Sequence, residues 1–339
     1  MAKQYSVAVV GATGAVGQEM LRTLENRNFP VGQLKLLASA RSVGKKFTYK
    51  GSEYAVEELT ENSFEGVEIA LFSVGGSISK KFAPAAVKAG AVVVDNTSAF
   101  RMDPEVPLVV PEVNPEDVFK HKGIIANPNC STIQMVHTLK PLHDYGKIKR
   151  VVVSTYQAVS GAGLKAIEEM LKETEAVLNN KTYERKIFPH QIAFNALPRI
   201  PQSGGIEDGG YTNEEVKMIQ ETKKIMHDDS IQVTATCVRI PVVKGHSESV
   251  NVQTEKQITV DMARKLLSET PNIIVMDCLE KEEYPLATHA CDKYETFVGR
   301  IREDKSIDYA LDLWIVSDNL LKGAALNSVQ IAEVLISEK

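Results

Sequence analysis

A glycine-rich loop between a short apolar run and a helical pattern constrains this fold more than any other feature. The apolar run "YSVAVV" spans residues 5–10, glycines stand at 11, 14 and 17, and residues 15–28 have helical spacing. Glycines at such a turn let the backbone approach a pyrophosphate, and the following helix presents free N–H groups and a positive dipole end. The spacing is GxxGxxG rather than GxGxxG, and a tight turn without a ligand is the plainer alternative. The order strand, loop, helix favours a dinucleotide site.

Strand-like and helical segments then alternate as far as residue 127. Further apolar runs lie at 34–39, 68–74, 91–95 and 123–127, and residues 79–90 have the pattern of a helix. This alternation predicts an α/β fold, a Rossmann-like doubly wound parallel sheet with helices on both faces.

After Cys130 the strands become longer and several alternate apolar with polar residues. The predicted strands are 148–157, 231–240, 247–255, 294–302 and 306–316, and the predicted helices are 131–146, 162–179, 212–229 and 319–339. Alternation of this kind indicates a sheet with one solvated face and a largely antiparallel or mixed strand order. We therefore expect a nucleotide domain over 1–128, joined by the helix 319–339, and an α+β domain over 129–318.

Length and composition support two domains and exclude several classes of protein. A chain of 339 residues is too long for one ordinary core, and a net charge of −5 argues against nucleic acid as the main partner. No apolar run is long enough to cross a bilayer, and the four cysteines and seven histidines show no metal-ligand spacing. That spacing predicts no metal site. The N-terminus lacks a signal-peptide pattern, so we expect a cytoplasmic protein.

The residues after the second predicted strand favour NADP over NAD. An NAD site usually has Asp or Glu there to bind the ribose 2′-OH, whereas "LLASARSVGKK" contains no acid. It contains Ser39, Arg41 and Ser42, and a guanidinium can pair with a 2′-phosphate. A solvated basic turn is the alternative.

Cys130, in "NPNCST", is the predicted nucleophile. It follows a strand and begins a helix, where the helix dipole favours the thiolate. The neighbouring Asn127, Asn129, Ser131 and Thr132 could donate hydrogen bonds to a developing oxyanion. A buried, inert thiol is the commoner state of a free cysteine, and we expect it for Cys237, Cys278 and Cys291.

Three polar residues of the second half could serve the same chemistry. Gln157 ends a strand, and Arg239 and His246 stand on either side of a break in the apolar pattern. A buried Arg239 would need a carboxylate partner, and His246 could be the acid or base that a cysteine nucleophile requires, although each could also be structural.

A nicotinamide site combined with a cysteine nucleophile predicts one kind of reaction. The thiolate adds to an aldehyde, hydride passes to NADP⁺, and the thioester transfers its acyl group to water or phosphate. The phosphate route needs an anion site, for which Arg101 and Lys217 are candidates, unless both are surface cations.

Several segments resemble the bacterial type of aspartate-β-semialdehyde dehydrogenase: "GATGAVGQEM", "DNTSAFRM", "VPEVN", "NPNCSTIQ", "TYQAVSGAG" and "CVRIPVVKGHSES". The resemblance runs from the first strand into the C-terminal helix. It implies reversible, NADPH-dependent reduction of L-aspartyl-4-phosphate to L-aspartate 4-semialdehyde and phosphate through a cysteine thioester. This reaction stands at the branch toward lysine, diaminopimelate, methionine, threonine and isoleucine.

The resemblance also implies roles for individual residues. Cys130 would be the acyl-thioester nucleophile, His246 the acid/base, and Gln157 would orient the intermediate. Arg239 would bind the substrate carboxylate and Glu214 its amino group. The phosphate site would comprise Arg101 and Lys217. The NADP site would comprise Gly11, Thr13, Gly14, Ala15, Val16, Ser39, Arg41, Ser42, Ser160, Gly161 and Asn319.

The resemblance implies a homodimer formed through the second domain, as in most of the family, while some members form tetramers. One motif departs from the Gram-negative branch, which has "RCHS" where this chain has "KGHS", and His246 keeps its place. The nearest alternative family is N-acetyl-γ-glutamyl-phosphate reductase, whose cysteine usually follows "PG" rather than the "PN" found here. A cysteine hydrolase or acyltransferase without a redox cofactor, and a catalytically dead nucleotide sensor, are alternatives of other classes.

Overall fold

The computed structural model describes residues 3–201 and 205–337 and consists of two compact units. The first unit comprises Met1–Asn129 and Ala324–Lys339, and the second Cys130–Gly323. The sequence placed the last boundary before residue 319, whereas residues 319–323 belong to the second unit. They are held there by Asp318, whose Oδ1 accepts the N–H groups of Leu320 and Leu321.

The first unit contains a seven-stranded sheet in the order β3-β4-β2-β1-β5-β6-β7. Its strands are β1 (Tyr5–Val10), β2 (Val31–Ala38), β3 (Lys46–Tyr49), β4 (Ser52–Glu58), β5 (Ile69–Phe72), β6 (Val92–Asp95) and β7 (Ile124–Ala126). All neighbouring pairs are parallel except β3 with β4. The Rossmann-like prediction is confirmed, and the antiparallel pair β3–β4 at the edge of the sheet is an addition that the sequence analysis missed.

Alternate residues of β1 explain why both faces of this sheet are covered. Val7 and Val9 pack into a core with helices α1 (Ala15–Asn26) and α8 (Leu326–Ser337). Ala8 and Val10 pack on the opposite face with α2 (Gly76–Lys88). A strand that is apolar on both faces is the mark of a buried parallel sheet.

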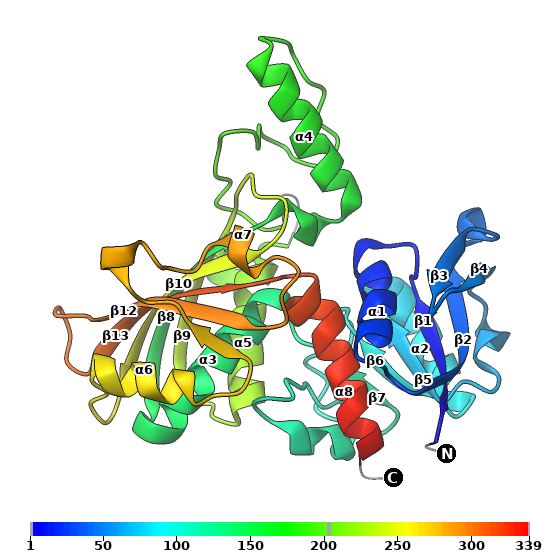
Figure 1. Cartoon of the computed structure of the whole chain (residues 1–339), viewed down its shortest axis with the longest axis horizontal. Coiled ribbons are helices and arrows are strands. Elements are labelled where there is room, and N and C mark those ends of the chain that lie inside the picture. The colour runs from blue at the N-terminus through cyan, green and yellow to red at the C-terminus, as the bar shows by residue number, and fades with distance from the viewer. Residues whose placement is uncertain (1–2, 202–204, 338–339) are drawn as a thin grey trace. The chain divides into compact units, whose positions relative to one another are not determined.

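The second unit contains a six-stranded mixed sheet in the order β11-β12-β13-β10-β8-β9 (Figure 1). Its strands are β8 (Ile148–Gln157), β9 (Gln232–Arg239), β10 (His246–Thr254), β11 (Ile273–Val275), β12 (Thr296–Glu303) and β13 (Ala310–Ser317). The pairs β8–β9 and β11–β12 are parallel and the other three are antiparallel. The predicted mixed sheet is confirmed, with the short strand β11 unforeseen.

One face of this sheet packs against α3 (Cys130–Gly146), α5 (Asn213–Met226) and α6 (Val260–Ser268), of which α6 was not predicted. The remaining helices are α4 (Leu164–Leu178), the short α7 (Ala287–Ala290) and a π-helical turn at Leu321–Ala325 before α8. Helix α4 projects from the unit as an arm (Figure 1). No helix among the described residues is long and apolar enough to span a membrane.

The loop that returns along α4 is held by two buried carboxylates. Glu169 accepts the backbone N–H groups of residues 186–188, and Glu173 accepts those of residues 192 and 193. Hydrogen bonds from backbone amides to carboxylates are among the stronger kinds, so the arm has its own internal support.

Candidate active site

The glycine loop of the first unit has the backbone geometry that its sequence predicts. Gly11 has a φ of +87°, and a Cβ there would lie 2.0 Å from the carbonyl oxygen of Ser73. A Cβ at Gly17 would lie 2.2 Å from the carbonyl oxygen of Gly11, so only glycine fits at both positions. Gly14 is the N-cap of α1, where no described side chain caps the helix. The N–H groups at this helix start are therefore not used by a capping side chain.

The predicted cofactor residues of the first unit gather at one edge of the sheet. Gly11 and residues 13–16 are half-buried at the end of β1, while Ser39 and Arg41 are exposed just after β2. Ser42 is buried and donates its N–H to the carbonyl of Ser39. Because β1 and β2 are parallel neighbours, their carboxyl ends meet at the edge where such folds bind nucleotides.

Arg101 also belongs to the first unit, and its guanidinium is held in a fixed position. Its Nε donates to the carbonyl of Asn127 at 2.9 Å and its Nη2 to the carbonyl of Asn96 at 2.7 Å. The residue is 7 % exposed, which does not fit the alternative of a solvated surface cation.

In the second unit the strand register brings three predicted site residues into one row. Arg239 at the end of β9 pairs with Gln157 at the end of β8. His246 begins β10, whose next residue, Ser247, pairs with Tyr156 of β8. The three side chains therefore lie side by side at one end of the sheet, on the face that the helices cover.

Cys130 is the first residue of α3 and is half-buried beside this row. The Gln157 Nε2 donates to the Oγ of the adjacent Ser131 at 2.9 Å, and Cys130 is close enough to Arg239 to act on its pKa. A Cβ at Gly323 would lie 2.8 Å from the Cβ of Cys130, so glycine there leaves room for the thiol-bearing side chain.

His246 is fully buried and its proton position is set by one hydrogen bond. The N–H of Ala158 donates to the Nδ1 at 3.0 Å, so the neutral ring carries its proton on Nε2. The Nε2 has no hydrogen-bond partner among the described residues. Burial, and next the charge of Arg239, lower the pKa of His246 to about 3, so the ring is neutral at neutral pH.

Arg239 is 3 % exposed, and its pKa is lowered by burial against the opposing effect of Glu214. Its Nη1 donates to the carbonyl of Ala158 at 2.6 Å, while its Nε has no acceptor among the described residues. The sequence predicted a carboxylate partner, but no ion pair joins Arg239 to a described acid. Glu214 instead accepts from Gln157 at 3.3 Å and from Lys217 at 3.0 Å. A buried guanidinium with donors to spare is suited to a carboxylate ligand.

The three predicted cofactor residues of the second unit lie close to the segment that carries His246. A Cβ at Gly161 would lie 3.0 Å from the Arg239 Nη1 and 3.4 Å from the His246 Nε2. The Asn319 Oδ1 accepts the N–H of Gly245 at 2.8 Å, and its Nδ2 donates to Ser160 at 2.9 Å. Asn319 thus ties its own loop to the residue that precedes His246.

The structure also shows what sequence reasoning missed. Nothing had singled out Gly323 or the backbone of Ala158, although a glycine inside the apolar stretch "LLKGAA" is a signal of close approach. Cys237 is buried as expected, but Cys278 and Cys291 are only half-buried, which corrects their prediction. Both follow short elements at the margin of the unit rather than lying inside a core strand.

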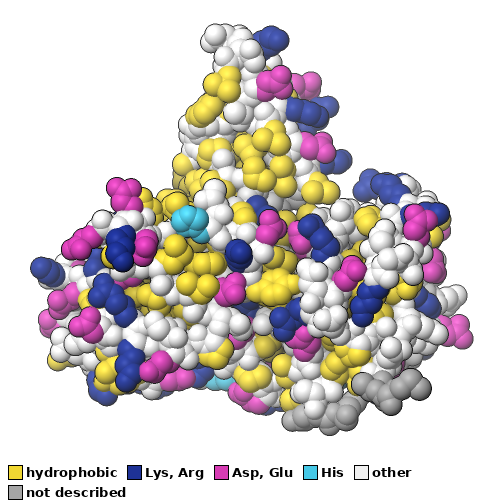
Figure 2. All heavy atoms as spheres, in the orientation of Figure 1, with side chains coloured by type: hydrophobic (Ala, Val, Ile, Leu, Met, Phe, Trp, Pro, Cys, Tyr) yellow, Lys and Arg dark blue, Asp and Glu magenta, His cyan; other side chains and the backbone are white. Residues whose placement is uncertain are grey.

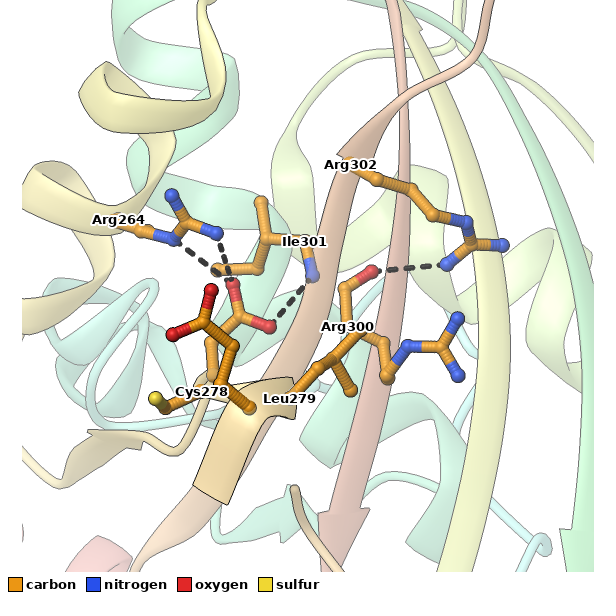
Figure 3. A pocket seen from close by; sticks show the side chains of 8 residues that line it. Arg264, Cys278, Leu279, Arg300, Ile301 and Arg302 are labelled. Atoms are coloured by element: carbon orange, nitrogen blue, oxygen red, sulfur yellow. Dashed lines mark hydrogen bonds and ion pairs between the residues drawn. The ribbon is translucent and has the colours of Figure 1, made fainter. Parts of the chain in front are cut away.

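A cavity of about 340 Å³ lies apart from these residues, beside β12. In Figure 3 the Nε and Nη2 of Arg264 bind the Asp277 carboxylate, and the guanidinium of Arg302 donates to the carbonyl of Arg300. Cys278 also lines this cavity, which contains none of the predicted site residues.

Two family models match this architecture and define a two-domain semialdehyde dehydrogenase. Residues 6–121 match "Semialdehyde dehydrogenase, NAD binding domain", and residues 139–322 match "Semialdehyde dehydrogenase, dimerisation domain". The chain is 60% identical over 338 residues to the aspartate-semialdehyde dehydrogenase of Aquifex aeolicus, covering 98% of each protein.

Solved structures agree with these matches. Aspartate semialdehyde dehydrogenase II of Vibrio cholerae, complexed with ASA, has a TM-score of 0.96 and 48% identity over 99% of each chain. The Candida albicans enzyme with NADP has a TM-score of 0.77 and 27% identity over 98% of each chain. The chain belongs to the aspartate-semialdehyde dehydrogenase family.

Proposed function

We propose that this chain catalyses the reversible, NADPH-dependent reduction of L-aspartyl-4-phosphate to L-aspartate 4-semialdehyde and phosphate. The observation that carries the proposal is the row of Gln157, Arg239 and His246 at one end of a sheet, with Cys130 at the helix start beside it. We place the reaction in the cytoplasm, at the branch toward lysine, diaminopimelate, methionine, threonine and isoleucine.

Each residue of the row has a part in this reaction. The Cys130 Sγ attacks the acyl carbon, the bond to phosphate breaks, and a thioester forms. Bound NADPH supplies the hydride that reduces the thioester. The His246 Nε2–H faces the site without another partner and is placed to donate to the substrate oxygen as negative charge develops there. The aldehyde is released when the carbon–sulfur bond breaks and Cys130 regains its thiolate.

The substrate's fixed groups match the remaining side chains. Arg239 has donors available for the α-carboxylate of the substrate. Glu214 lies close enough to Arg239 to act on its pKa, so its carboxylate is placed to bind the charged amino group of the same substrate. Gln157 is held between Ser131 and Glu214, so its amide is fixed for orienting the intermediate.

The experiment that tests the proposal is phosphate-dependent formation of NADPH from L-aspartate 4-semialdehyde. Turnover that requires phosphate supports the acyl-phosphate route. Turnover without phosphate would indicate hydrolysis of the thioester, and turnover only with N-acetylglutamate semialdehyde would favour the reductase alternative.

We propose NADP as the preferred cofactor because Arg41 is exposed directly after β2 and no acid stands there. Arg41→Ala is expected to raise the Michaelis constant for NADP about tenfold and to change that for NAD little, since the lost charge pairs only with the 2′-phosphate. Steady-state kinetics with both cofactors measure this. The matched control is Lys46→Ala, which removes a cation that is paired with Glu53. Equal use of both cofactors by the unaltered protein would contradict the preference.

Arg101 and Lys217 are the proposed phosphate ligands, each held within its own unit. Lys217→Leu is expected to raise the Michaelis constant for phosphate on the order of tenfold while that for NADP stays within about twofold, because a point charge for the anion is lost. The control is Lys224→Leu on the same helix. An unchanged dependence on phosphate would place the anion elsewhere.

The dimerisation-domain match indicates association of two copies, and we propose that the arm provides part of the contact. Leu164, Leu171 and Leu178 recur every seven residues on α4, so they share one helix face, and all three are exposed. Hydrophobic side chains gather over this projecting segment in Figure 2. A second copy of the chain covers this stripe in the proposed homodimer, and a tetramer would require a further surface.

Leu171→Asp is expected to weaken the dimer by one order of magnitude or more, because a charge would be buried in an apolar contact (roughly 1–2 kcal/mol or above). Sedimentation velocity over a range of protein concentrations measures the change. Lys172→Asp introduces the same carboxylate at the next exposed position and should leave the dimer intact. Equal dimer formation by both variants would remove the arm from the interface.

A further inference from the structure

Directly behind the predicted site lies a second row of side chains. Cys237 of β9 pairs with Thr155 of β8, and Thr155 pairs with Glu248 of β10. Each stands two residues from a member of the first row on its own strand, about 7 Å away and on the same face. On α3, Gln134 follows Cys130 by four residues and therefore lies below it on the same side of the helix.

Glu248 is the unusual member of this second row. It is fully buried, and neither of its carboxyl oxygens has a hydrogen-bond partner among the described residues. The same holds for both polar atoms of the Gln134 amide and for the Thr155 hydroxyl. Several unpartnered polar groups buried together are costly unless they serve one another, so this cluster needs an explanation.

The surroundings of Glu248 favour the uncharged acid. Burial raises its pKa well above the ordinary value, and the neighbouring Gln134 amide opposes that rise. The titratable groups on the elements around it include Cys130 and His137 of α3, Glu214 of α5, Cys237 and Arg239 of β9, and His246 of its own strand. No charged group among the described residues contributes to its pKa.

The position of Glu248 matters because negative charge develops in front of it. A carboxylate one pleat behind His246 would oppose the thiolate and the substrate oxyanion in front of it. A protonated carboxyl has no such effect, and its O–H can be shared with the Gln134 amide.

We propose that Glu248, as the uncharged acid, is a positioning residue of the active site: it links strand β10 to Gln134 of α3 and so fixes Cys130 against His246. The inference rests on the proposed function. It adds a residue to which neither the sequence motifs nor the predicted site assigned a role.

Two variants of the full chain test this link. Glu248→Gln preserves the neutral hydrogen-bonding group, whereas Glu248→Met fills the same space without it. Glu248→Met is expected to lower kcat for the semialdehyde about tenfold with KM within about twofold, because a displaced nucleophile affects the reaction rather than binding. Its melting temperature should equal or exceed that of the wild type, since a buried polar group is replaced by an apolar one. The conservative Glu248→Gln should keep kcat within about twofold of the wild-type value.

A second measurement does not depend on turnover. The rate at which iodoacetamide alkylates Cys130, followed by peptide mapping, should fall about tenfold in Glu248→Met at neutral pH and little in Glu248→Gln. Should the wild type fail to turn over the semialdehyde while this pattern holds, the proposed function fails and the positioning role stands. Wild-type rates of turnover and alkylation in Glu248→Met would overturn the positioning role, as would equal losses in both variants.

The pH dependence of stability provides an independent check if Glu248→Met does not fold. A group whose pKa is raised by folding contributes stability below its unfolded pKa and loses that contribution as pH rises through the folded pKa. The melting temperature of the wild type should therefore decline toward alkaline pH relative to that of Glu248→Gln. Parallel melting curves for the two proteins would show that Glu248 does not bind this proton, and the proposal would be wrong.

Discussion

Cys130→Ser is expected to reduce turnover of the semialdehyde on the order of a thousandfold or more while the fold and NADP binding persist. The hydroxyl of serine stays protonated at neutral pH, so the helix start has no thiolate to favour. The change removes little volume from a side chain that is only half-buried, and stability should hardly change. Steady-state kinetics, a melting curve and a titration with NADP on one preparation measure the three quantities.

Cys278→Ser is the matched control, because this thiol is also half-buried and lies in the cavity beside β12. It should retain full activity. Trapping an acyl-enzyme and locating it on Cys130 by mass spectrometry would support the nucleophile directly. Substantial activity in Cys130→Ser would assign the acyl transfer to another group.

The sequence predicts the elements that carry the site but not how they are paired. The strand 148–157 and its terminal Gln157 follow from an apolar run with a Gly-rich end, and the structure has the same bounds. Nothing local states that β9 lies parallel to β8, or that β10 returns antiparallel on its other side. Those pairings are long-range, and they alone bring Arg239, Gln157 and His246 into one row.

The features that escaped prediction have physical reasons. Strands β3 and β4 are mostly exposed, so they lack the apolar pattern by which a buried strand is recognised. Gly323 matters only because α3 begins beside it, and Glu248 looks like an ordinary polar residue in "GHSESV". Glu248 is buried because its side chain lies on the inward face of β10, where charged residue types are rare.

The anchoring of Arg239 makes it sensitive to a change that would be mild elsewhere. Its Nη1 donates to the carbonyl of Ala158, and the N–H of the same Ala158 fixes the His246 ring. Lysine cannot make that bond and also offer two parallel donors to a carboxylate. Replacing Arg239 with lysine would therefore alter both the binding of the substrate carboxylate and the hydrogen bond to Ala158.

Arg239→Lys is expected to lower kcat/KM for the semialdehyde by roughly one to two orders of magnitude, since a misplacement of about 1 Å can cost about a hundredfold in rate. The constants for phosphate and NADP should change much less. Arg302→Lys serves as the control, because Arg302 pairs with Asp312 at 3.1 Å and lines the cavity beside β12. Since no described acid forms an ion pair with Arg239, the variant should melt close to the wild type. A variant that melts at a clearly lower temperature and retains a near-normal kcat/KM would show that Arg239 supports the fold and does not bind the substrate carboxylate.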